Sequence, residues 1–181
     1  AWREKAQEDG LNIRVGRWNI PGAPVAILVD FTPFFSNKND IFTHLWKNFQ
    51  LDSISGQWDY IEPALFGHAA AKVIESFYNY YCTRDDRIAA NFHEWMCGMG
   101  VLHLHDTTPQ IGTLFTTHAT VLGRTISGNG LELYDKLESF FPFDTAKRFN
   151  VQQKHSLEEK AARFAWTVMW DLIPSFLSGG S

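Results

Sequence analysis

Cysteine is scarce in this chain, and several features that would assign it to a large protein class are missing. The 181 residues include two cysteines, Cys82 and Cys97, which cannot form a disulfide framework, so we expect a reducing, cytoplasmic setting. No apolar run approaches the roughly 20 residues that a membrane-spanning helix requires. The net charge is −4 and the Lys and Arg residues do not cluster, so we expect neither nucleic acid nor a membrane as a partner.

Familiar catalytic and cofactor motifs are absent as well. There is no G-x-S-x-G nucleophile turn, and the "GNG" at residues 128–130 is not the G-x-G-x-x-G fingerprint of a dinucleotide site. On a strand, His103 and His105 would share one face, in the manner of a metal-binding pair. No second pair completes a four-ligand set, and Cys97 is flanked by apolar residues. The sequence therefore predicts no metal site and no cofactor.

Apolar and aromatic residues are plentiful, at 45% and 15% of the chain, which is enough to fill the core of one domain. Short apolar runs alternate with segments whose apolar residues recur at helical spacing, the longest from Tyr60 to Tyr81. This order is typical of a parallel sheet joined by crossover helices. We therefore predict an α/β fold, a parallel Rossmann-like sheet flanked by helices, with central strands at Val25–Val29, Ile88–Phe92 and Leu114–Thr117.

The two ends of the chain differ in pattern from the middle. Ala1–Glu8 is typical of a helix and is charged, unlike a signal peptide; it begins without a capping residue, so we expect the chain to be a piece of a longer protein. Ser156 and Glu159 in "SLEE" form the pattern of a capping box, which predicts the start of the last clear helix. The closing residues "SFLSGGS" are typical of a flexible end.

Polar side chains follow two of the predicted strands at the point where each strand ends. His93 and Glu94 follow one strand, and His118 follows the next. The carboxyl ends of parallel strands open on a common crevice where such folds bind ligands, so we expect these side chains to meet there. Arg124, six residues beyond His118, offers a charged fork suited to a diphosphate. The alternative is structural: a charge favoured at a helix N-terminus, core histidines and a surface arginine.

Longer stretches around these residues resemble a known family. The segments "FHEWMCGMGVL" and "TLFTTHATVLGRTISGNGLELYD" are similar to the glycogen synthases of the animal and fungal type, which also occur in some bacteria. The similarity extends back to "VGRWNIPGAPVAILVDF" and forward to "QKHSLEEKAA". It implies a retaining glucosyltransferase that moves glucose from UDP-glucose to the non-reducing end of an α-1,4-glucan such as glycogen. It also implies the GT-B fold, two Rossmann-like domains facing a cleft. Residues 1–165 would form part of the N-terminal domain, and residues 166–181 a divergent tail that leaves the last sheet strand unassigned.

The same resemblance implies roles for single residues. His118 would contact the donor glucose and Arg124 the donor phosphates, while Glu94 and His93 would line the cleft. The family's K-V-G-G loop and its C-terminal domain have no counterpart in these residues, so we expect no catalytic residue within the chain and no activity of the chain alone. The resemblance also allows a homo-oligomer of the full-length protein. Two alternatives stay open: a non-catalytic nucleotide- or sugar-binding module of Rossmann-like fold, and another sugar-nucleotide transferase of the same architecture.

Overall fold

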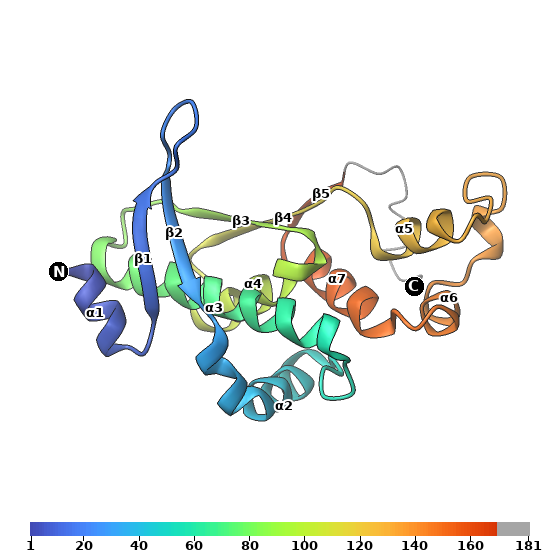
Figure 1. The fold of residues 1–181 in the computed structure, drawn as a ribbon, viewed down its shortest axis with the longest axis horizontal. Helices are drawn as coiled ribbons and strands as arrows, with labels where there is room; N and C mark the ends of the chain where they lie inside the picture. The colour runs from blue at the N-terminus through green and yellow to red at the C-terminus, as the bar shows by residue number, and fades with distance from the viewer. Residues whose placement is uncertain (170–181) are drawn as a thin grey trace.

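The computed structural model describes residues 1–169, and Figure 1 shows how their elements are arranged. Among these residues, no helix is long and apolar enough to span a membrane. Two short 3₁₀ helices lie at Thr32–Asn37 and Leu137–Ser139. The main elements, in chain order, are α1 (Trp2–Glu8), β1 (Asn12–Arg17), β2 (Val25–Asp30), α2 (Lys38–Phe49), α3 (Trp58–Tyr81), β3 (Ala89–His93), α4 (Glu94–Thr107), β4 (Gly112–Thr117), α5 (Val121–Gly128), α6 (Pro142–Arg148), α7 (Gln152–Phe164) and β5 (Trp166–Met169).

A parallel sheet ordered β3-β4-β5 forms the centre of the fold. Helices α3, α4 and α7 pack against one face of it, as Figure 1 shows for the helices beneath the strands. The buried residues at this interface include Phe92 and Phe115 from the strands and Val101 from α4. The predicted α/β fold with a parallel sheet is confirmed, and two of the predicted strands correspond to β3 and β4.

Strand β2 does not belong to this sheet. We predicted Val25–Val29 as a central parallel strand, and that part of the prediction was wrong. Residues Val25–Asp30 instead pair antiparallel with Asn12–Arg17 in a separate two-stranded ribbon, where Leu28 is 68% exposed. Because the turn between the two strands is short, their antiparallel pairing closes only a small loop. An apolar run of this length does not distinguish a strand covered on both faces from a strand in an exposed ribbon.

Two glycines allow α3 and α4 to pack closely. A Cβ atom on Gly100 would lie 2.2 Å from the Phe92 ring and 2.9 Å from the backbone oxygen of Gly67. A Cβ atom on Gly67 would lie 3.1 Å from the backbone oxygen of Cys97. Protein interiors are close-packed, so neither site has room for a larger residue without a shift of the backbone. This packing holds α4 against α3, and Glu94 is the first residue of α4.

The sequence predictions for the C-terminal part hold less well. The "SLEE" pattern predicted a helix start at Ser156, whereas α7 begins at Gln152. His155 is buried within this additional turn and its backbone N–H donates to Val151, so tertiary packing outweighs the local capping signal. The predicted tail opens with β5, which pairs parallel with β4 and supplies the last sheet strand. The rest of that tail, including "SFLSGGS", lies outside the described residues.

Candidate functional site

The carboxyl ends of β3 and β4 bring the predicted acid and imidazole together. His93 is the last residue of β3 and pairs in register with Thr116, two residues before His118. Glu94 opens α4, and its Oε1 accepts a hydrogen bond from the backbone N–H of His118 at 2.9 Å. A carboxylate in this position is also favoured by the helix dipole. These side chains therefore meet at one edge of the sheet, as expected from their places after the strands.

Glu94 has a backbone conformation that residues other than glycine seldom adopt. Its φ is +64°, in the left-handed region, because the chain turns from β3 into α4 with no intervening loop. Such a conformation costs about 1–3 kcal/mol and persists only where the surroundings impose it. Here the close packing of α4 and the hydrogen bond to His118 impose it. Backbone strain of this kind concentrates at functional sites, which adds weight to this strand end as the site.

The imidazole of His93 lies directly against that of His118. The ring centroids are 5.5 Å apart, the planes differ by 12°, and His93 Nδ1 lies 3.3 Å from His118 Nε2. Neither histidine is a core residue, since both are exposed. The structural alternative of two core histidines is therefore wrong. Asn91, two residues before His93 on the same face of β3, contacts the His93 ring and was missed by sequence reasoning. The period-two spacing of Asn91 and His93 was the available signal.

A second carboxylate holds the loop that carries His118. Glu158, on α7, is fully buried and accepts hydrogen bonds from the hydroxyl of Thr117 at 3.1 Å and from the backbone N–H of Val121 at 2.9 Å. Thr120 caps α5 by accepting a hydrogen bond from the backbone N–H of Gly123. Both ends of the short connection from β4 to α5 are thus fixed. Sequence reasoning missed Glu158, because the "SLEE" pattern directed attention to the neighbouring glutamate.

Arg124 lies on α5 and lines a hollow of about 260 Å³. Glu94, at the start of α4, and Lys154, on α7, line the same hollow. The Lys154 amine lies 5.6 Å from the centre of the Trp95 ring and forms an ion pair with Asp59. Two cationic side chains therefore border the same hollow as the Glu94 carboxylate. Guanidinium groups bind phosphate oxygens in a bidentate manner, so this hollow is suited to an anionic group. Arg124 and Glu94 thus border one hollow, whereas His118, which the sequence spacing paired with Arg124, is not among its lining residues, so the joint role of His118 and Arg124 stays a prediction.

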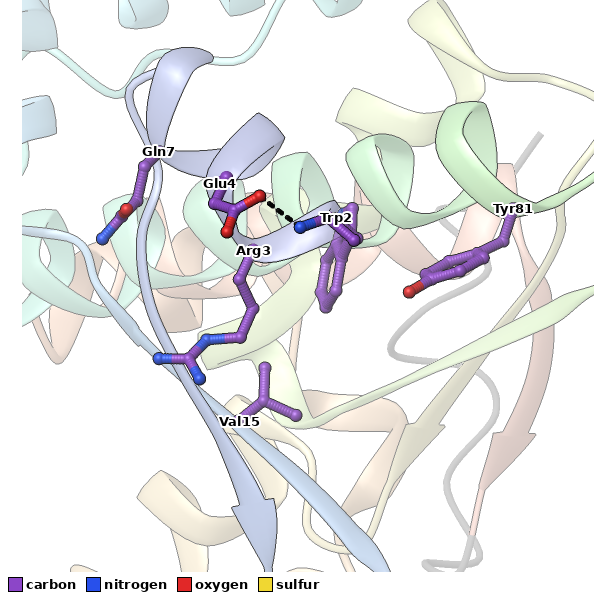
Figure 2. A pocket seen from close by; sticks show the side chains of 7 residues that line it. Trp2, Arg3, Glu4, Gln7, Val15 and Tyr81 are labelled. Atoms are coloured by element: carbon purple, nitrogen blue, oxygen red, sulfur yellow. Dashed lines mark hydrogen bonds and ion pairs between the residues drawn. The ribbon is translucent and has the colours of Figure 1, made fainter.

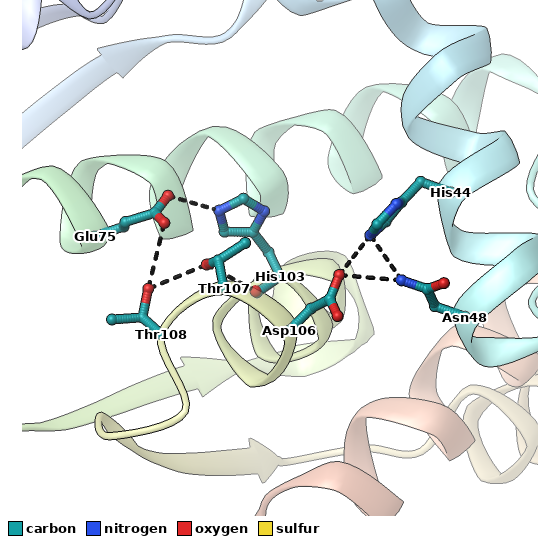
Figure 3. Close-up of polar contacts among 7 residues, drawn as sticks. All are labelled: His44, Asn48, Glu75, His103, Asp106, Thr107 and Thr108. Carbon is teal, nitrogen blue, oxygen red and sulfur yellow. Dashed lines mark hydrogen bonds and ion pairs between the residues drawn. The ribbon is translucent and has the colours of Figure 1, made fainter.

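The His103 and His105 pair is not on a strand. Both lie near the end of helix α4, where residues two apart point in different directions. The ring of His105 packs on Phe164, while His103 Nε2 is hydrogen-bonded to Glu75 at 3.0 Å, as Figure 3 shows. The expectation of a shared face was therefore wrong. Among residues 1–169, no group of three or more His, Cys, Asp or Glu side chains is placed to hold a metal ion.

The polar cluster of Figure 3 lies at the opposite end of α4 from Glu94. There His44 Nε2 is 2.5 Å from the carboxylate of Asp106, which also accepts a hydrogen bond from Asn48. Burial lowers the pKa of His103, although its hydrogen bond with Glu75 acts in the opposite direction. This cluster therefore joins α2, α3 and α4 near the C-terminal end of α4, away from the carboxyl ends of β3 and β4.

A larger hollow of about 510 Å³ lies between α1, β1 and the end of α3. Figure 2 shows its lining side chains, with the Trp2 and Tyr81 rings on one side and Arg3 and Val15 on another. None of the residues predicted for the site borders it. Size alone therefore does not identify the site, and the strand ends remain the candidate.

Comparison with known proteins agrees with the resemblance seen in the sequence. A family profile described as glycogen synthase matches residues 3–170. The glycogen (starch) synthase of Dictyostelium discoideum is 28% identical over 154 residues, which are 84% of this chain and 17% of that protein. Isoform 2 of the Saccharomyces cerevisiae enzyme is 30% identical over 157 residues, 86% of this chain and 22% of that protein. The liver enzyme of Rattus norvegicus is 24% identical over 156 residues, 86% of this chain and 22% of that protein.

The chain spans about a fifth of the length of these relatives, between 17% and 22%. The family match runs across nearly all of the described residues, including both strand ends and the start of α5. It therefore confirms the resemblance carried by the segments around Glu94 and His118. On this match, the chain belongs to the glycogen synthase family.

Proposed function

We propose that the full-length protein is a glycogen (starch) synthase. It is a retaining glycosyltransferase that transfers glucose from UDP-glucose to the non-reducing end of an α-1,4-glucan such as glycogen. Family membership supports this proposal. The observation that carries it is the hydrogen bond between the Glu94 carboxylate and the backbone of His118, beside a hollow that Glu94 shares with Arg124. A sugar diphosphate requires a group for its hydroxyls and a fixed positive charge, and we assign these to His118 and Arg124.

Arg124 binds the diphosphate in this proposal. As UDP departs, negative charge develops on the diphosphate while the sugar becomes oxocarbenium-like. A fixed guanidinium stabilises that developing charge more than it stabilises the bound donor, which is the condition for raising turnover. Lys154 borders the same hollow and adds a second cation.

His118 hydrogen-bonds a hydroxyl of the donor glucose and fixes the orientation of the ring. Glu94 holds the backbone of His118 and accepts hydrogen bonds at the rim of the cleft; it is not the nucleophile. His93 packs beside His118 and lines the cleft. No residue of this chain is assigned a catalytic role, because the groups that act on the reacting bond belong to the other wall of the cleft.

The proposal also includes the domain organisation, the cellular location and the partners of the full-length protein. Residues 1–165 belong to the N-terminal Rossmann-like domain of a two-domain GT-B enzyme, and residues 166–181 form a tail whose first residues add β5 to the sheet. The C-terminal domain supplies the opposite wall of the cleft. The two cysteines are free thiols, which supports a cytoplasmic location. We propose no cofactor, nucleic acid or membrane partner for the full-length protein, and the family resemblance allows a homo-oligomer.

An assay of the full-length protein over glycogen, with UDP-glucose and with other sugar nucleotides, tests this function. We expect incorporation of glucose from UDP-glucose. His118→Ala and Arg124→Ala should each lower turnover on the order of 10²-fold or more, the scale of removing one preorganised donor. Arg84→Ala removes an exposed arginine from the loop before β3 and is the matched control; it should leave turnover unchanged.

Other outcomes would identify the alternatives. Transfer from a different donor would indicate another sugar-nucleotide transferase of the same architecture. Binding of a sugar nucleotide without transfer would indicate a non-catalytic module. Near-normal kinetics in both site variants would show that His118 and Arg124 are structural and that the site lies elsewhere.

A further inference from the structure

A series of hydrogen bonds runs from the buried Thr116 to His118, on the face of the sheet opposite to Phe92 and Phe115. The Thr116 hydroxyl donates to Asn91 Oδ1 at 3.0 Å. Asn91 Nδ2 lies 3.2 Å from His93 Nε2, and His93 Nδ1 lies 3.3 Å from His118 Nε2. We refer to Thr116, Asn91, His93 and His118 as the relay. Three of its members lie on the paired strands β3 and β4 and the fourth directly follows β4, so the sheet register holds the series in place.

The chemistry of the asparagine gives the relay a direction. Because the Asn91 carbonyl oxygen accepts from Thr116, its amide nitrogen faces His93, and an amide nitrogen can only donate. His93 Nε2 must therefore accept, so the neutral His93 ring carries its proton on Nδ1. That Nδ1–H donates to His118 Nε2, which must accept in turn. The neutral His118 ring consequently carries its proton on Nδ1.

We propose that this relay fixes His118 as the Nδ1–H tautomer and that Asn91 and His93 are positioning residues for it. The consequence for turnover rests on the proposed function, whereas the tautomer does not. In this state Nε2 of His118 is held by His93, and Nδ1 can only donate. Any group that meets Nδ1, of the protein or of a ligand, is therefore a hydrogen-bond acceptor, as a hydroxyl or phosphate oxygen of a sugar nucleotide is.

One nearly isosteric substitution reverses the relay. In Asn91→Asp the carboxylate can only accept, so His93 Nε2 becomes the donor and, while the His93 ring is neutral, His93 Nδ1 becomes the acceptor. His118 must then donate from Nε2, and its neutral ring loses the proton from Nδ1. Thr116→Val adds no charge and acts differently: it removes the hydroxyl that orients the Asn91 amide, so both directions become accessible. Comparison of Asn91→Asp with Thr116→Val separates a change in the direction of the relay from the effect of a new negative charge, because only Asn91→Asp adds a charge.

Nitrogen-15 NMR of the histidine side chains in the 181-residue chain reads the tautomer directly. The chain has seven histidines, and His118→Ala identifies the signals of His118 by their loss. We expect a protonated Nδ1 and an unprotonated Nε2 in the unmodified chain, the reverse in Asn91→Asp, and a mixture in Thr116→Val. A protonated Nε2 in the unmodified chain, or an unchanged His118 tautomer in Asn91→Asp at a pH where the His93 signals show a neutral ring, would overturn the proposal.

Kinetics of the full-length protein separate this inference from the proposed function. An incorrect histidine tautomer in a catalytic triad costs on the order of 10⁴ in turnover, and for a histidine that orients substrate we expect on the order of 10-fold or more. Asn91→Asp should show that loss, and Thr116→Val a smaller one. If the tautomer reverses and turnover is unchanged, the relay stands and the role given to His118 fails. If the His118 tautomer does not reverse while His93 is neutral, the relay fails whatever the activity.

Discussion

Glu94 is joined to His118 through the main chain, since its Oε1 accepts a hydrogen bond from the His118 backbone nitrogen at 2.9 Å. The carboxylate therefore holds the position of the histidine, while His93 contacts its ring. Glu158 holds the same connection from the other side, through Thr117 and Val121. Two carboxylates from separate helices, one on α4 and one on α7, thus keep a short loop in one conformation.

The contact between Glu94 and His118 predicts a graded effect of substitutions at Glu94. Glu94→Gln keeps an oxygen that can accept from the His118 N–H, so we expect it to lose less than the roughly 10²-fold expected for His118→Ala. Glu94→Ala removes the acceptor and should lose more than Glu94→Gln. Turnover of the full-length variants measures this order, with circular dichroism to show that they fold. Equal kinetics in both variants and the unmodified protein would mean that the contact does not position His118.

The buried Glu158 predicts a large effect on stability. Glu158→Leu leaves the Val121 N–H and the Thr117 hydroxyl without this acceptor, and each buried donor left in that state costs about 1–3 kcal/mol. We expect the free energy of unfolding of the 181-residue chain to fall by roughly 2–6 kcal/mol in chemical denaturation. The matched control is Glu159→Gln on the same helix, which breaks an ion pair with the half-exposed Arg163. It should change stability by less than about 1 kcal/mol. Comparable losses in the two variants would argue against the role of Glu158.

The close packing of α4 predicts that a single methyl group destabilises the fold at Gly100. Alanine normally favours a helix over glycine by about 1 kcal/mol, but at this position its Cβ would meet the Phe92 ring and the backbone of α3. We expect Gly100→Ala to lower the free energy of unfolding by about 1–3 kcal/mol. Gly128→Ala, where no atom lies within 4 Å of the added Cβ, is the control and should be neutral or stabilising. A neutral Gly100→Ala would show that α3 and α4 separate easily.

Buried histidines predict that acid destabilises the fold. Burial, assisted by nearby His103, lowers the pKa of His68 from an ordinary 6.5 to about 3. Between these values the unfolded chain binds a proton that the folded chain does not, so the free energy of unfolding falls as pH drops below 6.5. The slope is about 1.4 kcal/mol per pH unit for one fully titrating group. Burial also lowers the pKa of His103 and of His155, which adds to the effect in the same direction.

Denaturation of the 181-residue chain at pH 7.5 and at pH 5.5 measures that slope. His68→Leu replaces a ring that packs on Phe34 and His103 with an apolar side chain that cannot bind a proton. We expect this variant to lose less stability between the two pH values than the unmodified chain. A variant with the original slope would show that His68 is not a source of the acid sensitivity.

The proposed cleft predicts that the 181-residue chain alone has no turnover and binds UDP-glucose poorly. A cleft enzyme contacts its donor from both walls and excludes water by closing them. One wall alone leaves the diphosphate hydrated and loses orientation that can supply roughly 7–11 kcal/mol of barrier reduction. Calorimetry with UDP-glucose and an incorporation assay over glycogen check this. Turnover by the chain alone would place the catalytic groups within it.

The sequence was informative wherever function and fold depend on local spacing. The alternation of apolar runs with helical patterns predicted β3, β4 and the helix at Tyr60–Tyr81, because periodicity reports directly which face of an element is buried. Polar residues directly after two strands predicted that Glu94 and His118 would meet, because parallel strands end at one edge of a sheet. The family motifs lie at these same strand ends. That part of the site follows from order along the chain.

Strand pairing and contacts between distant residues were decided by the tertiary structure, because the spacing of residues along the chain does not specify them. The run at Val25–Val29 looked like a buried central strand, yet its partner is the adjacent β1, since pairing depends on the cost of closing the loop. Glu158 and Glu159 are neighbours in the same motif, and only the packing of α7 against β4 and α5 places one in the interior and the other at the surface. Asn91 and His93 share a strand, and their spacing can be read from the sequence, but the contact of Asn91 with Thr116 depends on the pairing of β3 with β4. Contacts between residues distant in sequence depend on how whole elements pack, and no local pattern records that.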